Sequence, residues 1–246
     1  MNADEYVKMA EVEDRMWYFR SLHAHTARGL ASAGLAGNAA VLDAGCGTGG
    51  LIIRARQWPG ASRWSGIDFM PLACQLARQR CGPGVDIREA SITALPFADA
   101  SFDAVVSVDV ICQVDNPEVA IGEFSRVLRP GGTLVINVPA YQWMWSYHDD
   151  TVHTKHRYTR REVADVLRTG GFTVRTLTHW NALPFPLVWA KRKVFHSASD
   201  TSDVKDYPGP IDAMFGGMMA IEHAWLRLGG TWAWGTSVFA VARKPG

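Results

Sequence analysis

The first 140 residues alternate between short apolar runs and longer amphipathic segments, and this alternation restricts the fold more than any other feature of the chain. Five apolar runs predict buried strands, at 39–44, 64–69, 85–88, 102–108 and 133–138. The segments between them predict helices, at 48–57, 71–80 and 117–128. Strands that alternate with helices favour a parallel sheet, and continuously apolar strands are typical of burial on both faces. We therefore expect an α/β fold with helices on both sides of the sheet.

The pattern loosens after residue 139. Residues 129–132 predict a turn, and Thr159 with Glu162 forms the sequence of a capping box at the start of a helix over 159–168. Two further strands are expected at 172–177 and 236–242, and the residues between them do not alternate. We expect four segments, which are an N-terminal helical segment (1–37), a core (38–180), a helical insert or cap (181–234) and the last strand (235–246).

Composition excludes several classes of protein. The 25 lysines and arginines nearly balance the 24 aspartates and glutamates, for a net charge of +1, whereas a general nucleic-acid binder usually carries a basic surplus. No apolar run has the length of a membrane-spanning helix, and the first residues lack the apolar core of a signal peptide. The four cysteines have no metal-finger spacing. We expect no nucleic-acid partner, no stable membrane insertion, no metal and a cytoplasmic location.

A glycine-rich stretch, 41–50, lies where the first strand meets the first helix. Gly45 and Gly47 allow the backbone to turn tightly and a ligand to come close, and open parallel sheets bind ligands at the carboxyl ends of their strands. Asp43 directly precedes the glycines, where a carboxylate would repel a pyrophosphate and attract a cation. Asp68 ends the second strand, where an acid can accept hydrogen bonds from ribose hydroxyls. The site therefore favours a ligand that has both a ribose and a positive charge.

S-adenosylmethionine has both groups, and the chain resembles the class I S-adenosylmethionine-dependent methyltransferases, in particular those that act on small molecules. Four stretches in order carry the resemblance: VLDAGCGTGG (41–50), GIDFM (66–70), ASITALPF with SFD (90–97 and 101–103), and LRPGGTLVINVP (128–139). The resemblance implies a Rossmann-like, mostly parallel seven-stranded sheet with an antiparallel last strand and a helical insert before it. It also implies S-adenosylmethionine as the cofactor.

The same resemblance implies a role for each residue that matches the family's motifs. The methionine end of the cofactor would lie on the residues after the first strand, Asp43, Ala44, Gly45, Cys46 and Gly47. Asp68 would hold the ribose hydroxyls. The adenine would lie on residues after the second and third strands, Phe69, Met70, Ser91 and Ile92. Many members have Asp where this chain has Ser91, and a hydroxyl bonds to the adenine amine more weakly than a carboxylate.

Asp109 and Val110 follow the fourth strand and should face the cofactor pocket. Many members continue with an acid and a histidine, whereas this chain has Cys112 and Gln113. An obvious base is therefore missing, and Gln113 becomes a candidate substrate contact.

The segment 15–20 resembles an aromatic-then-arginine stretch that precedes the first strand in a subset of the family. The resemblance implies that Trp17 and Arg20 help to close the cofactor site. An alternative is an ordinary helix whose Trp17 and Phe19 pack on the sheet.

Methyl transfer is an in-line displacement in which alignment alone can supply ~7–11 kcal/mol, and a base is needed only if the nucleophile must lose a proton. The best base or substrate contact is His148, which Asp149 could orient. Two alternatives stay open. This stretch could be an ordinary surface loop, or a metal could bind to His148, Asp149, His153 and His156, the last two of which would share a face on a helix.

The insert is the candidate element for choosing the acceptor. Its predicted helix, 211–228, carries one apolar stripe, made of Met214, Met218, Ile221, Trp225 and Leu228. The stripe could line an acceptor pocket as a cap, or it could cover the sheet or a partner in a homodimer. A third interpretation is contact with a membrane surface, because 183–195 joins apolar residues to Lys191, Arg192 and Lys193.

These observations predict a methyltransferase that acts on an O, N or C nucleophile of a mostly apolar or aromatic small molecule. One alternative is an NAD-type oxidoreductase, because Gly45, Gly47 and Gly50 also match the weak dinucleotide fingerprint. Another is a protein of this fold that binds the cofactor without catalysis, as the absence of the usual acid and histidine at Cys112 and Gln113 would allow.

Overall fold

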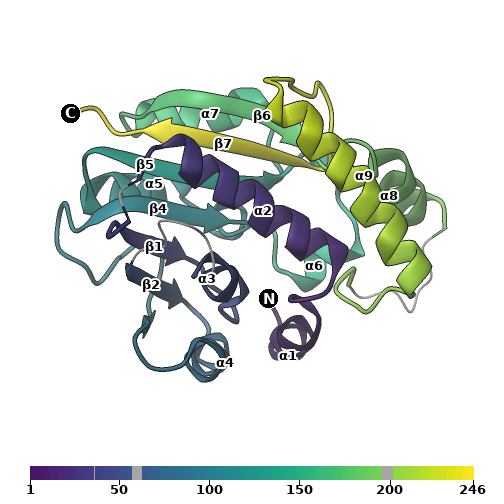
Figure 1. Cartoon of the computed structure of the whole chain (residues 1–246), viewed down its shortest axis with the longest axis horizontal. Coiled ribbons are helices and arrows are strands. Elements are labelled where there is room, and N and C mark those ends of the chain that lie inside the picture. Colours follow the sequence, from purple (N-terminus) through teal and green to yellow (C-terminus); the bar gives the residue numbers. More distant parts are fainter. Residues whose placement is uncertain (36, 57–62, 196–201) are drawn as a thin grey trace.

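The computed structural model describes residues 1–35, 37–56, 63–195 and 202–246. Within them, seven strands form one sheet in the order β3-β2-β1-β4-β5-β7-β6, in which β7 runs antiparallel to both of its neighbours and the other pairs up to β5 are parallel (Figure 1). The strands are β1 (Ala40–Ala44), β2 (Arg63–Asp68), β3 (Asp86–Glu89), β4 (Phe102–Val108), β5 (Leu128–Pro139), β6 (Thr173–Trp180) and β7 (Ser237–Arg243). The predicted Rossmann-like sheet with an antiparallel last strand is confirmed.

Helices cover both faces of this sheet. They are α1 (Ala3–Val12), α2 (Trp17–Ser32), α3 (Gly50–Ala55), α4 (Pro71–Cys81), α5 (Pro117–Val127), α6 (Tyr147–Thr151), α7 (Arg160–Thr169), α8 (Phe185–Lys193) and α9 (Gly209–Arg227). Apolar residues of α5 and α7 pack into one core against the sheet, and those of α2, α3 and α4 pack into a second core on the opposite face. Figure 1 shows α2 lying across the front of the sheet, with α8 and α9 at one end.

Local sequence signals explain how the core helices begin. Pro71 and Pro117 stand at the first positions of α4 and α5, where a missing N–H costs no helical hydrogen bond. Thr159 and Glu162 form the predicted capping box at the start of α7, and the residues after this helix turn through Gly171, whose φ is +82°.

The N-terminal residues and the insert meet on one face of the molecule. Helix α2 packs against α9, and Gly29 allows it to approach the sheet closely, because a Cβ at this position would lie 3.0 Å from the Phe239 ring of β7. Trp180 at the end of β6 is fully buried and stacks on Tyr18 of α2. The first and last parts of the chain are therefore tied to the same edge of the core.

The observed elements differ from the predicted ones in a few places. The turn expected at 129–132 is part of β5, which begins at Leu128, and the pairing of β4 with β5 is irregular at this point. The helix expected at 48–57 is shorter, at 50–55, and its predicted end at 57–60 lies outside the described residues. Helices α6 and α8 had no clear periodic signal, because one has five residues and the other begins among prolines.

Candidate functional site

A cavity of about 990 Å³ opens at the carboxyl ends of β1, β2, β4 and β5. Its walls come from four parts of the chain, which are α1 with the start of α2, the loops after the strands, the region around α6, and the insert. This is the place where open α/β sheets bind their ligands. All of the sequence-predicted site residues line this cavity except Ala44 and Arg20.

The glycine loop after β1 is held open by hydrogen bonds to β2. The N–H groups of Gly45 and Cys46 both donate to the carbonyl of Ile67, at 2.9 and 2.8 Å. Gly45 has a φ of +99°, and a Cβ there would lie 2.2 Å from the Val110 side chain. Both the positive φ and the lack of room for a Cβ require glycine at this position. The predicted tight turn therefore brings bare backbone and Val110 to the cavity wall.

Asp43 is the unusual group in this loop. Its side chain is 2% exposed, it lines the cavity, and no described residue gives its carboxylate a hydrogen bond or an ion pair. Burial and, secondarily, the nearby charge of Asp68 raise the pKa of Asp43 to about 8. A buried carboxylate without a partner is costly, so this position fits a ligand that brings a positive group.

Asp68 at the end of β2 has several donors. Its carboxylate accepts hydrogen bonds from the N–H groups of Gly47 (3.0 Å) and Met70 (2.9 Å) and from the hydroxyl of Tyr6 (3.2 Å). Burial raises the pKa of Asp68, and these three donors act in the opposite direction. No local pattern in the sequence pointed to Tyr6, which comes from α1 and links that helix to the site.

The residues predicted to hold an adenine lie together at one end of the cavity. Phe69 is 77% exposed, so its ring is free to cover a flat ligand, and Met70 lies beside it. Ile92 is buried, and the Ser91 hydroxyl is 2.7 Å from that of Thr93. Ser91 therefore already has a neighbour that competes for its hydrogen bond.

Asp109 follows β4 with a left-handed backbone, at a φ of +56°, which points its side chain back toward the sheet. Its carboxylate accepts from the Tyr18 hydroxyl (3.0 Å) and from the Asn137 side-chain amide (2.8 Å). Burial raises the pKa of Asp109 to about 6 despite these donors. The Gln113 amide donates to the backbone carbonyl of Asp109 (3.1 Å). Tyr18 was missed at the sequence level, although it lies inside the aromatic segment 15–20.

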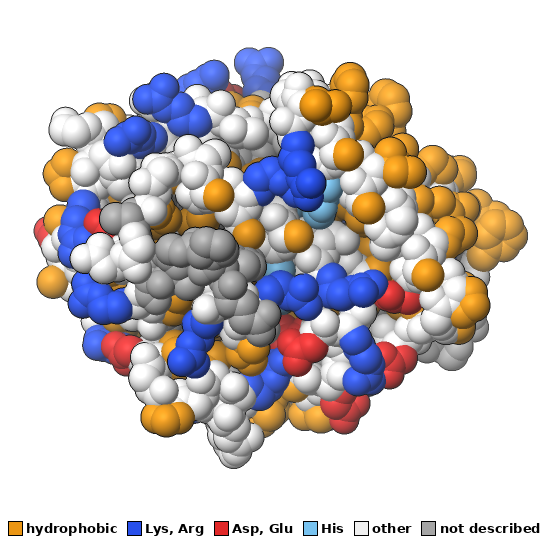
Figure 2. All heavy atoms as spheres, in the orientation of Figure 1, with side chains coloured by type: hydrophobic (Ala, Val, Ile, Leu, Met, Phe, Trp, Pro, Cys, Tyr) orange, Lys and Arg blue, Asp and Glu red, His pale blue; other side chains and the backbone are white. Residues whose placement is uncertain are grey.

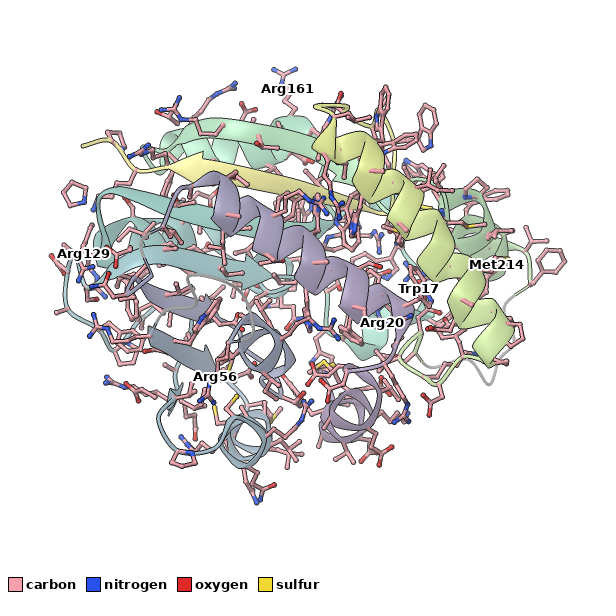
Figure 3. The ribbon with its side chains drawn as sticks, in the orientation of Figure 1. Trp17, Arg20, Arg56, Arg129, Arg161 and Met214 are labelled. Carbon is pink, nitrogen blue, oxygen red and sulfur yellow. The ribbon has the colours of Figure 1, made fainter. Side chains whose placement is uncertain are left out.

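Trp17 and Arg20 lie at the start of α2, next to α9 (Figure 3). Trp17 is buried, lines the cavity and stacks on Phe215 of α9, with ring centroids 4.7 Å apart. Arg20 does not line the cavity, because its guanidinium pairs with Asp212 of α9 at 2.5 Å. Asp212 also accepts from the Trp17 N–H (2.7 Å). Arg20 thus fastens α9 to α2, whereas Trp17 forms part of the cavity wall.

His148 lines the cavity and is neutral, since burial lowers its pKa to about 4, with the charge of Arg192 as a second cause. Its Nδ1 faces the backbone N–H of Asp203, at 3.3 Å. A neutral ring that accepts at Nδ1 carries its proton on Nε2. In this arrangement the hydrogen-bond donor of His148 is its Nε2–H.

Asp149 does not have the orienting role expected for it. Its carboxylate pairs with Arg157 at 2.7 Å, with both side chains at most 2% exposed, and it also accepts from the Ser146 N–H (2.9 Å). Arg157 in turn donates to the carbonyl of Ala140 (2.8 Å). The pair fixes the loop after β5 against the end of the sheet.

The alternative metal site is not formed. The Nε2 of His153 is within hydrogen-bond distance of the Asn2 side-chain oxygen, at 2.9 Å. The Nε2 of His156 lies 3.2 Å from a carboxylate oxygen of Glu162. The two histidines do not share a helix face, because α6 ends before them. In the part of the chain that the structure describes, no three His, Cys, Asp or Glu side chains are placed to hold a metal ion.

The insert contributes a buried charged cluster that sequence reasoning missed. Asp203 accepts from the Arg192 guanidinium (2.8 and 2.6 Å), from Lys191 and from the Tyr147 hydroxyl (3.0 Å). These contacts hold the pKa of Asp203 well below its usual range despite its burial. Two of the three basic side chains of α8, those of Lys191 and Arg192, are therefore turned inward, toward His148.

The apolar stripe of α9 is not a pocket lining. Phe215 is the residue of α9 that lines the cavity, whereas Met214, Ile221 and Leu228 of the stripe are exposed and do not line it. The insert still shapes the cavity, through residues of α8 and of 203–207. The side chains of the insert that line the cavity are therefore not those of the predicted stripe.

Comparison with known proteins agrees with this geometry. Residues 42–136 match the family described as "Methyltransferase domain". The chain is 34% identical over 137 residues to a probable S-adenosylmethionine-dependent methyltransferase of Mycolicibacterium smegmatis, covering 54% of this chain and 52% of the relative. It is 37% identical over 99 residues to a demethylmenaquinone methyltransferase of Thermus thermophilus, covering 39% and 45%. The chain therefore spans about half the length of the curated relatives it matches.

A solved structure shows the same fold. The geranyl diphosphate C-methyltransferase of Streptomyces coelicolor, determined with Mg²⁺, geranyl diphosphate and S-adenosylhomocysteine, superimposes with a TM-score of 0.63 at 18% identity, covering 92% of this chain and 80% of that one.

The ion pair of Asp149 with Arg157 predicts a structural defect when it is broken. Asp149→Asn leaves a buried guanidinium uncompensated, so we expect the free energy of unfolding in urea to fall by about 3–5 kcal/mol. Asp165→Asn on α7 removes an exposed carboxylate that pairs with Arg168 and should change this free energy by less than about 0.5 kcal/mol. Equal stability of the two variants would contradict the structural role of Asp149.

Proposed function

From the assignment of this chain to the class I S-adenosylmethionine-dependent methyltransferases, we propose that it transfers a methyl group from S-adenosylmethionine to a mostly apolar small molecule. The observation that carries the proposal is Asp43, a buried carboxylate on the cavity wall without a partner among the described residues. The cofactor brings the cation that this position lacks. An NAD-type cofactor would instead bring a pyrophosphate, which Asp43 would repel.

The remaining cofactor contacts follow from the shape of the cavity. Gly45, Cys46 and Gly47 would approach the methionine end through their backbone. Asp68 would accept from the ribose hydroxyls, and Phe69 would cover the adenine. The Tyr6 hydroxyl on Asp68 and the ring of Trp17 suggest that α1 and α2 close the cofactor end of the cavity.

The acceptor would occupy the part of the cavity between α2 and the insert. Its walls there are largely apolar or aromatic, and include Phe19, Leu22, Leu187, Val188 and Phe215. Walls of this kind bind apolar ligands and use a few polar groups to orient them. The relative named demethylmenaquinone methyltransferase supports an acceptor of this character.

The bound cofactor supplies a methyl carbon that is activated by a sulfonium. A nucleophilic atom of the acceptor would take this carbon, the electron pair of the broken carbon–sulfur bond would stay on sulfur, and the cofactor would leave as S-adenosylhomocysteine. This chain's contribution is alignment, which can supply ~7–11 kcal/mol. His148 would orient the acceptor by donating a hydrogen bond from Nε2, and Gln113 is a second polar group on the same cavity wall.

A protein that binds the cofactor without catalysis is the second candidate, because the site lacks a free base among the described residues near Asp109. Labelled-methyl transfer to a panel of aromatic and polyketide-like acceptors separates the two. Transfer to any acceptor supports the enzyme, whereas cofactor binding without transfer across the panel would favour the non-catalytic protein.

Removal of the Asp68 carboxylate should weaken cofactor binding. We expect Asp68→Ala to raise the calorimetric Kd for S-adenosylmethionine at least tenfold, about 1.4 kcal/mol, on the scale of a lost charged hydrogen bond. Asp86→Ala is the matched control, since Asp86 is an exposed residue of β3 that pairs with Arg88. An unchanged Kd in Asp68→Ala would refute the ribose assignment.

The role of His148 can be read from kinetics. If His148 donates a hydrogen bond to the acceptor, His148→Ala should lower kcat/KM by about 10- to 100-fold, as a lost hydrogen bond of roughly 1–3 kcal/mol would, with the cofactor Kd unchanged. His148→Gln, which keeps a donor, should recover part of this loss, and His156→Ala should behave like the wild type. Complete loss of turnover in both His148 variants would point instead to a general base.

A further inference from the structure

Helix α9 presents an apolar face to solvent. Ile211, Met214, Ile221, Trp225 and Leu228 lie on this outer face and are exposed, with Ile221 at 65% and Leu228 at 84%. The opposite side of the helix is buried at Met219, Glu222 and His223. Single exposed apolar residues are ordinary, but a row of large ones along a whole helix marks a docking surface.

Helix α8 extends the apolar surface at the same end of the molecule. Trp189, Val194 and Phe195 are exposed there, with Phe195 at 76%. Figure 2 shows hydrophobic side chains gathered along the right-hand side, where Figure 1 places α8 and α9, and Figure 3 shows Met214 on this side. Indole rings such as Trp189 and Trp225 are enriched at the boundary between lipid headgroups and acyl chains.

The exposed charges of these two helices are of one sign. Helix α8 contains no acidic residue. The acidic residues of α9 are both engaged, because Asp212 pairs with Arg20, and the buried Glu222 accepts from the backbone N–H groups of Ala182 and Leu183. The exposed charged side chains of α8 and α9 are those of Lys193, whose ammonium also donates to the Trp145 carbonyl, and of Arg227. This surface is therefore apolar with basic groups and fits an anionic partner.

The apolar surface adjoins the cavity. Leu187 of α8 is exposed and also lines the cavity, and Val188 lines it beside Leu187. On α9, Phe215 lines the cavity, whereas the residues of the exposed row do not. If α8 lay on an apolar surface, a molecule that left this surface at α8 would come directly against the cavity wall.

We propose that α8 and α9 dock this protein onto the surface of an anionic lipid bilayer. The two helices would lie in the interface with their exposed side chains among the lipids and Lys193 and Arg227 at the headgroups. The contact that we propose is peripheral. No helix of the described chain is long and apolar enough to cross a membrane. The proposal rests on the surface alone and does not require methyl transfer.

A second copy of the chain is the competing occupant. A two-fold interface would pair this surface with an identical one, which offers Lys193 and Arg227 no exposed carboxylate of α8 or α9. An anionic bilayer supplies the complementary charge. The charge pattern thus favours lipid over a dimer.

Co-sedimentation with vesicles tests the docking surface. The full chain should sediment with vesicles of phosphatidylcholine and phosphatidylglycerol, and less with phosphatidylcholine alone. The double variant Ile221→Ser/Leu228→Ser should lower the partition coefficient at least tenfold, and Lys193→Gln/Arg227→Gln should lower it at least fivefold on the phosphatidylglycerol vesicles. Val7→Ser, which removes an exposed aliphatic side chain from α1, should sediment like the wild type.

Either of two sedimentation results would overturn the proposal. Failure of the wild type to sediment with the anionic vesicles would do so, as would equal sedimentation of the wild type and Ile221→Ser/Leu228→Ser. Analytical ultracentrifugation distinguishes the competing occupant. A wild-type dimer that becomes monomeric in the double variant, without vesicle binding, would assign the face to a second copy. Binding of S-adenosylmethionine, measured separately by calorimetry, tests the proposed function whichever vesicle result is obtained.

Discussion

The buried carboxylate of Asp43 is the constraint on which the rest of the site depends. Asp43 lies in the first strand and is buried, and the glycines that follow it have no side chain that could pair with its carboxylate. Asp68 lies close enough to raise the pKa of Asp43 further, although its own carboxylate has three donors. The protein thus keeps two acids at one edge of its sheet and satisfies only one of them, which is how a site for a cation is built.

The segments on either side of the core complete this site from opposite directions. Helix α1 reaches Asp68 through Tyr6, and α2 reaches Asp109 through Tyr18. The insert approaches from the other side, with its inner charged cluster near His148 and its apolar face turned outward. Arg20 and Asp212 join the two segments. The same two helices, α8 and α9, would therefore contribute both to the acceptor part of the cavity and to the proposed docking surface.

The sequence predicted the sheet well because its signals are local. Apolar runs and glycine turns identify β1 to β5, and a capping box identifies α7. Contacts between distant residues were not predictable in this way. No local pattern says that Asp149 pairs with Arg157 rather than with its neighbour His148, or that Tyr6 reaches Asp68. The stripe of α9 was found by its period, but periodicity marks an apolar face without saying whether protein covers it.

Calorimetric titration of S-adenosylmethionine at pH 7, in buffers of different ionisation enthalpy, tests the central claim about Asp43 most directly. With a pKa of about 8, Asp43 is mostly protonated at this pH in the free protein, and a bound cation should ionise it. The account predicts that the wild type releases more protons on binding than Asp43→Asn does, by a difference that approaches one per site, and binds more tightly. The same proton count and the same affinity in both proteins would contradict it.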